Sequence, residues 1–324
     1  MTAYPIFTDK SADKVSALGE RRLIAAIRDW LGPVCPPAPH GIGDDCAVLA
    51  PSRHRQVITV DPVIHSRHFD DTVRPEEVGA KLLKRNLSDI AAMGARPTSA
   101  VISIALDPAV RLDWLRRFYL GMAKTARTHR VTIVGGDLAQ APGTFVASLT
   151  LLGEAVGPRL LSREGARPGD HLYVTGPLGG SILGHHTRFT PRLAEGAWLA
   201  SRPEVRAMMD ISDGLAKDLW SLTPPGAQPC VFRSSLPIAA AARRLSRRSG
   251  RPAWEHAASD GEDYELLVVA ARRADLDRLE RDWRRRFRRP LYHIGQYVSA
   301  VRVLPPGSLP LRSLTGYEHL GTAR

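Results

Sequence analysis

The sequence is poor in cysteine and has no long apolar run. Its 324 residues include three cysteines, Cys35, Cys46 and Cys230, and no two of them form a CxxC pair. An odd number of widely spaced cysteines predicts neither a disulfide framework nor a structural zinc site, and favours a reducing cytoplasm. No stretch of 18 apolar residues occurs, and residues 1–10 lack the apolar region of a secretory signal. We therefore expect no membrane span, no export and a cytoplasmic location.

Lysine is also scarce, although the chain is strongly basic. Only six of its 45 basic residues are lysine, and the net charge is +12. Arginines are concentrated in residues 243–248 and 281–289, both on helix-compatible patterns with Leu, Trp or Phe at the inward positions. A solvated helix face and a nucleic-acid surface are the two interpretations. The first is favoured, because no known nucleic-acid-binding module accompanies the charge.

The first half of the chain alternates short apolar runs with helical patterns, which is typical of α/β and α+β proteins. The first apolar run, residues 57–60, predicts a strand that ends at Asp61. Pro75 suits the first turn of a helix, and Gly94 suits its end. The other predicted strands are 101–106, 131–134 and 145–154, and the predicted helices are 75–93 and 111–128.

Residues 157–170 are rich in Gly, Pro and Arg and predict a domain boundary. The predicted domains are residues 1–156 and residues 157–324. The second half begins again with strands at 172–174 and 265–270 and a run at 208–211. No internal repeat is strict enough to indicate duplication.

Five short elements place carboxylates beside glycine or at the end of a strand or helix. They are residues 41–45, Asp61, residues 86–89, residues 135–137 and residues 210–214. Taken singly, each is more often a turn or a helix cap, and Asp213 in particular could cap the helix that follows it. A tight Gly-Gly-Asp turn at 135–137 can also bring backbone N–H groups close to an anion, while its carboxylate takes a cation.

Electrostatics favours a shared role for these acids. Two carboxylates about 4 Å apart repel by roughly 4 kcal/mol at an effective dielectric constant near 20. Mg²⁺ prefers hard oxygen ligands and usually combines one or two carboxylates with substrate phosphates and water. If the five elements converge, bound Mg²⁺ is the natural explanation.

Other elements are weaker indications. Residues 176–181 follow a strand and precede a predicted helix, so they could cradle phosphate, but they do not match a Walker A motif. Residues 259–265 carry four acids and form either a solvated loop or a site for a cationic or hydroxyl-bearing substrate. His65 and His68 have no third zinc ligand nearby. No nucleophile-plus-base motif occurs, which is compatible with phosphoryl transfer.

The five acidic elements and residues 261–266 occur in an order and at a spacing that resemble the bacterial thiamine-monophosphate kinase family. The most specific motifs are Asn86-Leu87-Ser88-Asp89 and Asp210-Ile211-Ser212-Asp213-Gly214. The resemblance runs from about Gly41 to Tyr317. It implies a two-domain α/β protein with α+β character and an aminoimidazole ribonucleotide synthetase-like fold. An N-terminal domain, residues 1–156, with a mixed sheet and helices would bind ATP and Mg²⁺ and form a homodimer. A C-terminal α/β domain, residues 157–324, would complete the active site.

The resemblance also implies the reaction, in which the γ-phosphoryl group of ATP moves directly to thiamine monophosphate with the help of several Mg²⁺ ions. The acceptor oxygen is ionised at neutral pH, so no general base is required. The implied metal ligands are Asp45, Thr59, Asp61, Asp89, Asp137, Asp210 and Asp213. The implied ATP contacts are Gly136, Asp137, Arg163 and Ser212. The implied contacts to the thiamine end are His68, Glu262 and Tyr317, and Asp210, Asp213 and Arg163 would act in catalysis.

The chain departs from the family pattern at hydroxyl positions. Val60 and Pro62 flank Asp61 where the family commonly has threonines, and Leu138 and Ala139 follow Asp137 where it has two more. Two alternatives therefore stay open. One is another ATP-dependent enzyme of the same superfamily, acting on a different phosphate or carboxylate acceptor. The other is a non-catalytic nucleotide- or nucleic-acid-binding protein on the same fold.

Overall fold

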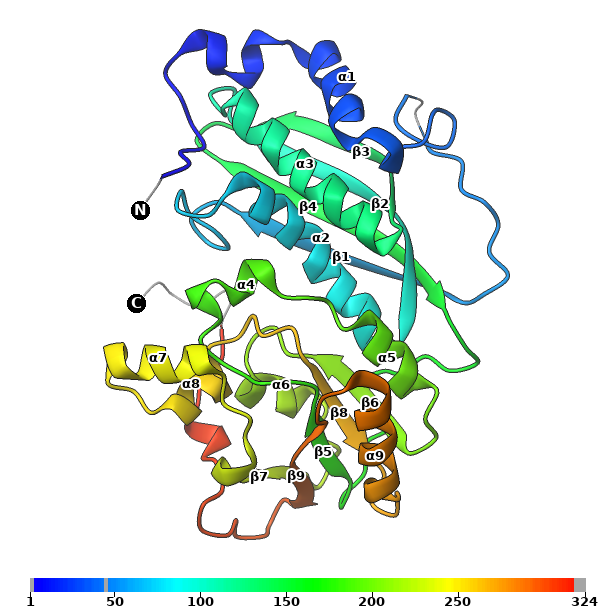
Figure 1. Ribbon diagram of the computed structural model, residues 1–324, viewed down its shortest axis with the longest axis vertical. Helices are drawn as coiled ribbons and strands as arrows, with labels where there is room; N and C mark the ends of the chain where they lie inside the picture. Colours follow the sequence, from blue (N-terminus) through cyan, green and yellow to red (C-terminus); the bar gives the residue numbers. More distant parts are fainter. Residues whose placement is uncertain (1–2, 44–45, 318–324) are drawn as a thin grey trace. The chain divides into compact units, whose positions relative to one another are not determined.

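The computed structural model in Figure 1 describes residues 3–43 and 46–317. The chain divides into two units, Met1–Ile90 with Arg96–Ala155, and Ala91–Ala95 with Val156–Arg324. Among the described residues, no helix has both the length and the apolarity that crossing a membrane requires.

The first unit is a mixed four-stranded sheet with helices on one face (Figure 1). Its strands run in the spatial order β1-β4-β2-β3, with β1 antiparallel to β4 and β2 parallel to β3. The strands are β1 (Gln56–Ile64), β2 (Ala95–Leu106), β3 (Thr132–Gln140) and β4 (Phe145–Ala155). The helices are α1 (Glu20–Leu31), α2 (Pro75–Ala92) and α3 (Leu112–His129), with short 3-10 turns at Ser11–Asp13, Val15–Ala17 and Gly32–Val34.

Strict alternation in β1 and β4 decides which face of this sheet is covered. In β4, Phe145, Ala147, Leu149 and Leu151 are fully buried, whereas the residues between them are partly exposed. Phe145 packs edge-on against Trp114 of α3, with ring centroids 5.0 Å apart. The helices thus bury one set of side chains and leave the other set on the opposite face.

The second unit is a five-stranded sheet in the order β6-β8-β5-β9-β7, and its neighbouring strands pair antiparallel. The strands are β5 (His171–Val174), β6 (Val205–Asp210), β7 (Ala227–Val231), β8 (Leu266–Ala270) and β9 (Tyr292–Ser299). The helices are α4 (His185–Arg188), α5 (Leu193–Ala200), α6 (Leu215–Ser221), α7 (Ala240–Ser249), α8 (Ala253–Ser259) and α9 (Leu276–Phe287). Short 3-10 turns lie at Ser181–Leu183, Arg233–Ser235 and Leu311–Ser313.

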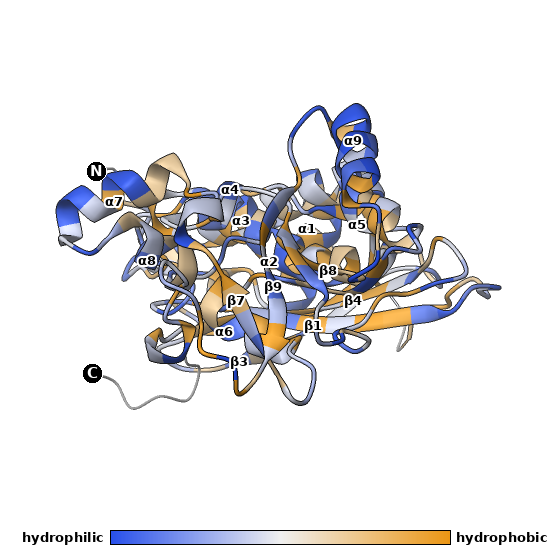
Figure 2. Cartoon of the chain, turned by 90° about the horizontal axis from the view of Figure 1, so that it is seen from below, coloured by the Kyte–Doolittle hydropathy of each residue, from blue (hydrophilic) through white to orange (hydrophobic). Residues whose placement is uncertain are grey.

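Both faces of the second sheet are buried, so its strands read as continuous apolar runs. Met209 packs in one core with residues of α6 and α8, while its neighbour Met208 packs in another with residues of α5 and α9. In α9 the inward Leu279 and Trp283 are buried. Its arginines at 284–286 are exposed. Figure 2 shows α9 as largely hydrophilic, as the predicted arginine-rich helix face requires.

Candidate active site

In the first unit, β1 and α2 bring together three of the predicted ligands. Thr59 and Asp61 are two residues apart on the half-buried side of β1, and the Thr59 hydroxyl donates to Asp89 of α2 at 2.5 Å. The buried Arg85, one turn before Asp89, lies 3.4 Å from the Asp61 carboxylate and donates to the Pro62 carbonyl at 2.6 Å. Hard oxygen atoms from a strand and a helix therefore lie next to one another, balanced by one guanidinium.

The predicted end of the first strand at Asp61 is wrong. β1 continues through Asp61 and Pro62 to Ile64. Proline is tolerated there because β1 stands at the edge of the sheet, where one row of N–H groups has no strand to bond. Val60 is 60% exposed and points to the opposite face from Asp61. The missing hydroxyl at Val60 therefore does not alter the surroundings of the Asp61 carboxylate.

The predicted tight turn at 135–137 is also wrong, because Gly135, Gly136 and Asp137 lie inside β3. Gly136 pairs with Ile102 in the neighbouring parallel strand. A Cβ atom at Gly136 would come within 2.2 Å of the Ile102 carbonyl oxygen, so this position requires glycine for close strand approach. Asp137 is exposed.

A cavity of about 420 Å³ opens beside this stretch of β3. Apolar side chains of α1, among them Ile24 and Ile27, line it together with Gly136, Asp137 and Leu138. Ile42 and Gly43 of the first acidic element also line it. Asp44 and Asp45 of that element lie outside the described residues. Of the four hydroxyl departures, Leu138 is thus the one that faces a cavity with predicted site residues.

His68 is held in one orientation in the first unit. Its Nδ1 accepts a hydrogen bond from the Ile64 N–H at 3.0 Å, so the neutral ring carries its proton on Nε2. Lys81, which is fully buried, donates to the His68 carbonyl at 2.8 Å. His65 instead binds Asp71 at 3.1 Å. The two histidines therefore have separate partners and do not form the start of a zinc site.

In the second unit, β6 ends at Asp210, one residue before the end of the predicted run at 208–211, and leads into the turn Ser212-Asp213-Gly214. The N–H groups of these three turn residues all point at one oxygen of Asp218, at 3.0, 3.1 and 3.2 Å. Asp218 lies in α6 and is 4% exposed. Burial raises the pKa of Asp218 to about 7, and the nearby Asp213 charge adds to the shift. The N-cap residue of α6 is Gly214, so the alternative that Asp213 caps this helix is wrong.

Sequence reasoning missed Asp218. The signal was present, since an acid four residues after Gly214 stands in the first turn of the predicted helix, where it faces free backbone N–H groups. The element was interpreted as ending at Gly214, so the carboxylate that organises it was left out.

The acidic segment 259–265 packs against the same turn and is not a solvated loop. Asp263 and Glu265 are 3% and 2% exposed. The Glu262 N–H donates to the Ser212 carbonyl at 2.7 Å, and the Tyr264 N–H donates to the Ile211 carbonyl at 2.9 Å. Burial holds the pKa of Asp263 well above its usual range.

Three residues of this segment adopt left-handed backbone conformations. Their φ angles are 72° at Gly261, 53° at Glu262 and 52° at Tyr264. Such angles are strained for side-chain-bearing residues and are typical of functional sites. The Tyr264 ring stacks on Phe189 with a centroid separation of 3.9 Å, which helps to hold the conformation.

Tyr317 reaches the same turn from the C-terminal segment. Its N–H donates to the Asp213 carbonyl at 2.9 Å, and its own carbonyl accepts from the Lys217 ammonium at 2.6 Å. Lys217 also lies 2.9 Å from the Asp213 carboxylate. Asp213, Ser212, Glu262 and Tyr317, four residues predicted from distant segments, are therefore neighbours within this unit. Arg163 is exposed on the segment that precedes β5.

The glycine-rich loop at 176–181 has its amides occupied by the chain itself. The Gly179 N–H donates to Asp263 at 2.7 Å, and the Gly180 N–H donates to Asp260 at 2.9 Å. The loop leads into a three-residue 3-10 turn rather than a long helix. The interpretation of this loop as a phosphate cradle is therefore not supported.

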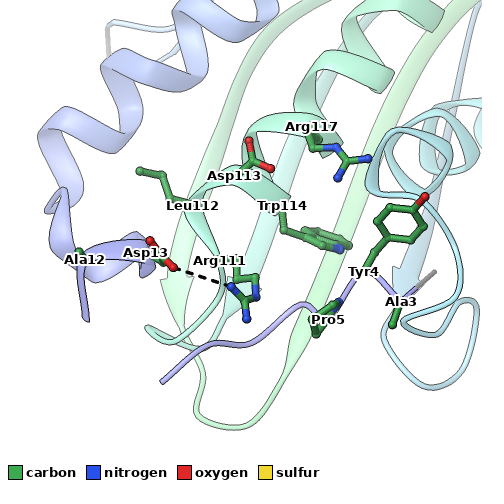
Figure 3. A pocket seen from close by; sticks show the side chains of 10 residues that line it. All are labelled: Ala3, Tyr4, Pro5, Ala12, Asp13, Arg111, Leu112, Asp113, Trp114 and Arg117. Atoms are coloured by element: carbon green, nitrogen blue, oxygen red, sulfur yellow. Dashed lines mark ion pairs between the residues drawn. The ribbon is translucent and has the colours of Figure 1, made fainter. Parts of the chain in front are cut away.

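A larger cavity, of about 610 Å³, contains none of the predicted residues. It lies between the N-terminal segment and the start of α3, and Figure 3 shows the side chains that line it. Its arginines are engaged: Arg117 makes a bidentate pair with Glu76 at 2.7 and 3.0 Å, and Arg111 donates to the Phe7 carbonyl at 3.1 Å. Size alone does not make it the active site.

No group of three or more His, Cys, Asp or Glu side chains within residues 3–43 and 46–317 is arranged to hold a metal ion. Within the first unit, Asp61 and Asp89 lie at the contact of β1 with α2, and Asp137 lies on β3. Within the second unit, Asp210 ends β6 and Asp213 lies on the turn that Asp218 holds.

A family model and several known proteins resemble this chain. Residues 43–155 match the family model described as AIR synthase related protein, N-terminal domain. The chain is 39% identical over 241 residues to thiamine-monophosphate kinase of Rhodopirellula baltica, covering 71% of this chain and 76% of that protein.

Two solved structures share the fold. The crystal structure of thiamine-monophosphate kinase from Stenotrophomonas maltophilia K279a is 31% identical, has a TM-score of 0.73 and covers 90% of this chain and 97% of that chain. AaThiL complexed with AMPPCP and TMP is 26% identical, has a TM-score of 0.67 and covers 91% of this chain and 97% of that chain. The aminoimidazole ribonucleotide synthetase-like fold is thereby confirmed, and the chain belongs to the thiamine-monophosphate kinase family.

Proposed function

We propose that the protein transfers the γ-phosphoryl group of ATP to thiamine monophosphate and forms thiamine diphosphate. The observation that carries the proposal is the shared fold with AaThiL, whose structure holds AMPPCP and TMP, in a chain whose family is thiamine-monophosphate kinase. The intact carboxylates support it. The acceptor phosphate is already ionised at neutral pH, so the reaction requires positioning and charge neutralisation rather than a general base.

We propose that several Mg²⁺ ions assist the reaction. The donor set fits this ion, because the carboxylates and the Thr59 hydroxyl are hard oxygen ligands. The proposed ligands are Asp45, Thr59, Asp61, Asp89, Asp137, Asp210 and Asp213. When bound, Mg²⁺ would neutralise phosphate charge. Arg85 fixes the Asp61 carboxylate, and the Thr59 hydroxyl fixes that of Asp89, so the chain itself orients two of these ligands.

We assign nucleotide contacts to Gly136, Asp137, Arg163 and Ser212. The cavity between α1 and β3 offers apolar walls for a nucleobase next to the bare backbone of Gly136. Arg163 would offset negative charge as the phosphoryl group moves between two anions. Because the Ser212 N–H donates to Asp218, we expect Ser212 to act through its hydroxyl.

We assign the thiamine end of the acceptor to His68, Glu262 and Tyr317. The thiazolium ring of thiamine carries a positive charge, and a carboxylate such as Glu262 stabilises a nearby cation. The Glu262 side chain is 29% exposed, and the Tyr317 residue is 41% exposed, so both are accessible to a ligand.

We further propose a homodimer that forms through the uncovered face of the first sheet. Ile58, Val60 and Val101 are 70%, 60% and 37% exposed on this face. Exposed apolar residues that cluster on one sheet face are typical of an interface. We also propose that the protein acts in the cytoplasm, where ATP is available and thiols such as Cys46 stay reduced.

The activity is tested by incubating the purified protein with ATP, Mg²⁺ and thiamine monophosphate and following ³¹P resonances. New diphosphate-ester signals are expected. Absence of that product would reject the proposed acceptor. ATP consumption with another phosphate or carboxylate acceptor would select the superfamily alternative. A protein that binds nucleotide or nucleic acid but turns over nothing would select the non-catalytic alternative.

The dimer is tested by light scattering during size-exclusion chromatography. Ile58→Lys with Val60→Lys should convert the dimer into a monomer, whereas Ile182→Lys should not. Ile182 is 64% exposed but lies in the second unit, so it is a matched control. A wild-type protein that elutes as a monomer at micromolar concentration would refute the dimer.

A further inference from the structure

The turn Ser212-Asp213-Gly214 is folded around one buried carboxylate. A single oxygen of Asp218 accepts all three turn N–H groups, at 3.0 to 3.2 Å. Asp218 is 4% exposed. A carboxylate accepting several backbone N–H groups is among the stronger hydrogen-bonding arrangements in proteins, and it fixes the donors as one rigid unit.

The outward side of the same turn is equally constrained. The Ser212 carbonyl accepts from the Glu262 N–H at 2.7 Å, and the Asp213 carbonyl accepts from the Tyr317 N–H at 2.9 Å. The backbones of these two residues are therefore positioned by the turn and not by their own segments alone. A displacement of the turn would therefore also displace the backbones of Glu262 and Tyr317.

The use of the N–H groups also decides what the turn can bind. With its three amides directed inward at Asp218, the turn offers a ligand the Ser212 hydroxyl and the Asp213 carboxylate, which also lies 2.9 Å from the Lys217 ammonium. Oxygen atoms attract cations, whereas exposed amides attract anions. The glycine loop behaves in the same way, since Asp263 and Asp260 take the Gly179 and Gly180 amides.

We infer that Asp218 is a positioning residue for the phosphoryl-transfer site: it sequesters the turn amides, so that the 212–214 turn recognises cations rather than bare phosphate, and it sets the places of Glu262 and Tyr317. The expected change in kinetics rests on the proposed function. The structural part of the inference, that one carboxylate orders three segments, can be tested without measuring activity.

The test compares Asp218→Ala and Asp218→Asn with the wild type. The Asn variant keeps one acceptor oxygen, and the Ala variant keeps none. Hydrogen exchange of peptides covering residues 211–215, 262 and 317 should accelerate about tenfold or more in the Ala variant, because charge-assisted bonds are lost. The same variant should lose about 100-fold in kcat/KM, as expected when catalytic groups shift by about 1 Å. The Asn variant should recover most of both.

Asp170 supplies the matched control. It is 1% exposed and accepts two backbone N–H groups, from Arg167 and Arg272, both at 2.8 Å. Asp170→Ala should lower the unfolding midpoint. It should not change hydrogen exchange at residues 211–215, nor the kinetic constants once these are calculated per folded molecule. If Asp218→Ala does not fold, Asp218→Asn is compared with Asp170→Asn instead.

The inference is overturned if Asp218→Ala leaves local exchange at 211–215 unchanged, or if its kinetic loss is no greater than that of Asp170→Ala. It is also overturned if the Asn variant is as impaired as the Ala variant. A wild-type protein that does not phosphorylate thiamine monophosphate would reject the proposed function, while the exchange comparison would still decide the role of Asp218.

Discussion

The two units hold their acidic residues in different ways. In the first unit, Asp61 and Asp89 stand on a regular strand and a regular helix, and their side chains are fixed by Arg85 and Thr59. In the second unit, Asp213 stands on an irregular turn whose backbone is fixed by Asp218 on one side and by Glu262 and Tyr317 on the other.

This difference indicates which substitutions should disturb each unit most. A site built on regular elements is already placed by sheet and helix geometry, and side-chain changes there alter orientation only. A site built on a turn depends on specific backbone hydrogen bonds, so one substitution can move several residues together. We therefore expect second-unit substitutions to have the larger and less local effects.

The largest effect is expected at Asp210 in the second unit. Asp210→Asn should lower kcat at least about 1,000-fold, because a proposed metal ligand loses its charge at the reacting phosphates. Asp277→Asn, on the exposed face of α9, is the control and should leave turnover unchanged. Coupled measurement of ADP release checks both, and a near-normal rate for Asp210→Asn would refute the metal role.

The next effect concerns stability and the buried pair of Glu265 with Arg192. Glu265 is 2% exposed and receives two hydrogen bonds from Arg192, one at 2.9 Å, and one from Thr175 at 2.6 Å. Glu265→Gln removes the buried charge that faces the Arg192 guanidinium, which is 18% exposed and also lies 3.9 Å from Glu195. The loss of these charge-assisted hydrogen bonds should cost about 2 kcal/mol in the free energy of unfolding.

The first-unit control for this prediction is Glu77→Gln, which weakens a pair with Arg74, whose side chain is 57% exposed. Exposed pairs contribute roughly 0.2–1 kcal/mol, so the loss should be small. Urea unfolding of both variants checks the contrast, and equal losses would contradict it.

A smaller effect is expected at Thr59 in the first unit. Thr59→Val preserves shape but removes the hydroxyl that donates to Asp89, so kcat/KM should fall about tenfold, the magnitude of one hydrogen bond to a charged group. The unfolding midpoint should change little, because β1 keeps its β-branched residue. Thr98→Val, whose hydroxyl donates to the Leu152 carbonyl, is the control and should not alter kinetics.

The smallest effect is a pH dependence that compares one histidine of each unit. Burial lowers the pKa of His293, and His171 adds to the shift. Burial and the Lys84 charge lower the pKa of His129 in α3. Between each lowered value and about 6.5, the unfolded chain binds more protons than the folded chain, so stability falls as the pH drops below about 6.5.

His293→Gln and His129→Gln should each remove part of this acid sensitivity. Urea midpoints at pH 7.5 and 5.5 check the prediction. If each variant shows the same difference in midpoint between pH 7.5 and pH 5.5 as the wild type, neither histidine has a lowered pKa in the folded chain. The comparison is made against the wild type because Asp218, whose pKa is raised to about 7, acts in the opposite direction over the same pH range.

Two helices of the first unit were predictable to within a few residues, whereas the strand predicted at 101–106 begins six residues earlier, at Ala95. The helix predicted at 75–93 is α2 at Pro75–Ala92, and the helix predicted at 111–128 is α3 at Leu112–His129. Periodic apolar positions, a proline at the start and a glycine after the end identify these helices locally. The strand ends were wrong at Asp61 and Asp137, because edge strands accept proline and glycine that local rules assign to turns.

The sequence by itself determined the acidic motifs, their order and the kind of ligand they suit, since these depend on residue type and spacing. Only the tertiary structure decided which groups are available. Asp218 takes the turn amides, Asp263 and Asp260 take the loop amides, and Glu262 and Tyr317 meet at one turn from segments far apart in the chain. Hydrogen-bond capacity is finite, and a buried donor takes whichever acceptor the fold brings to it.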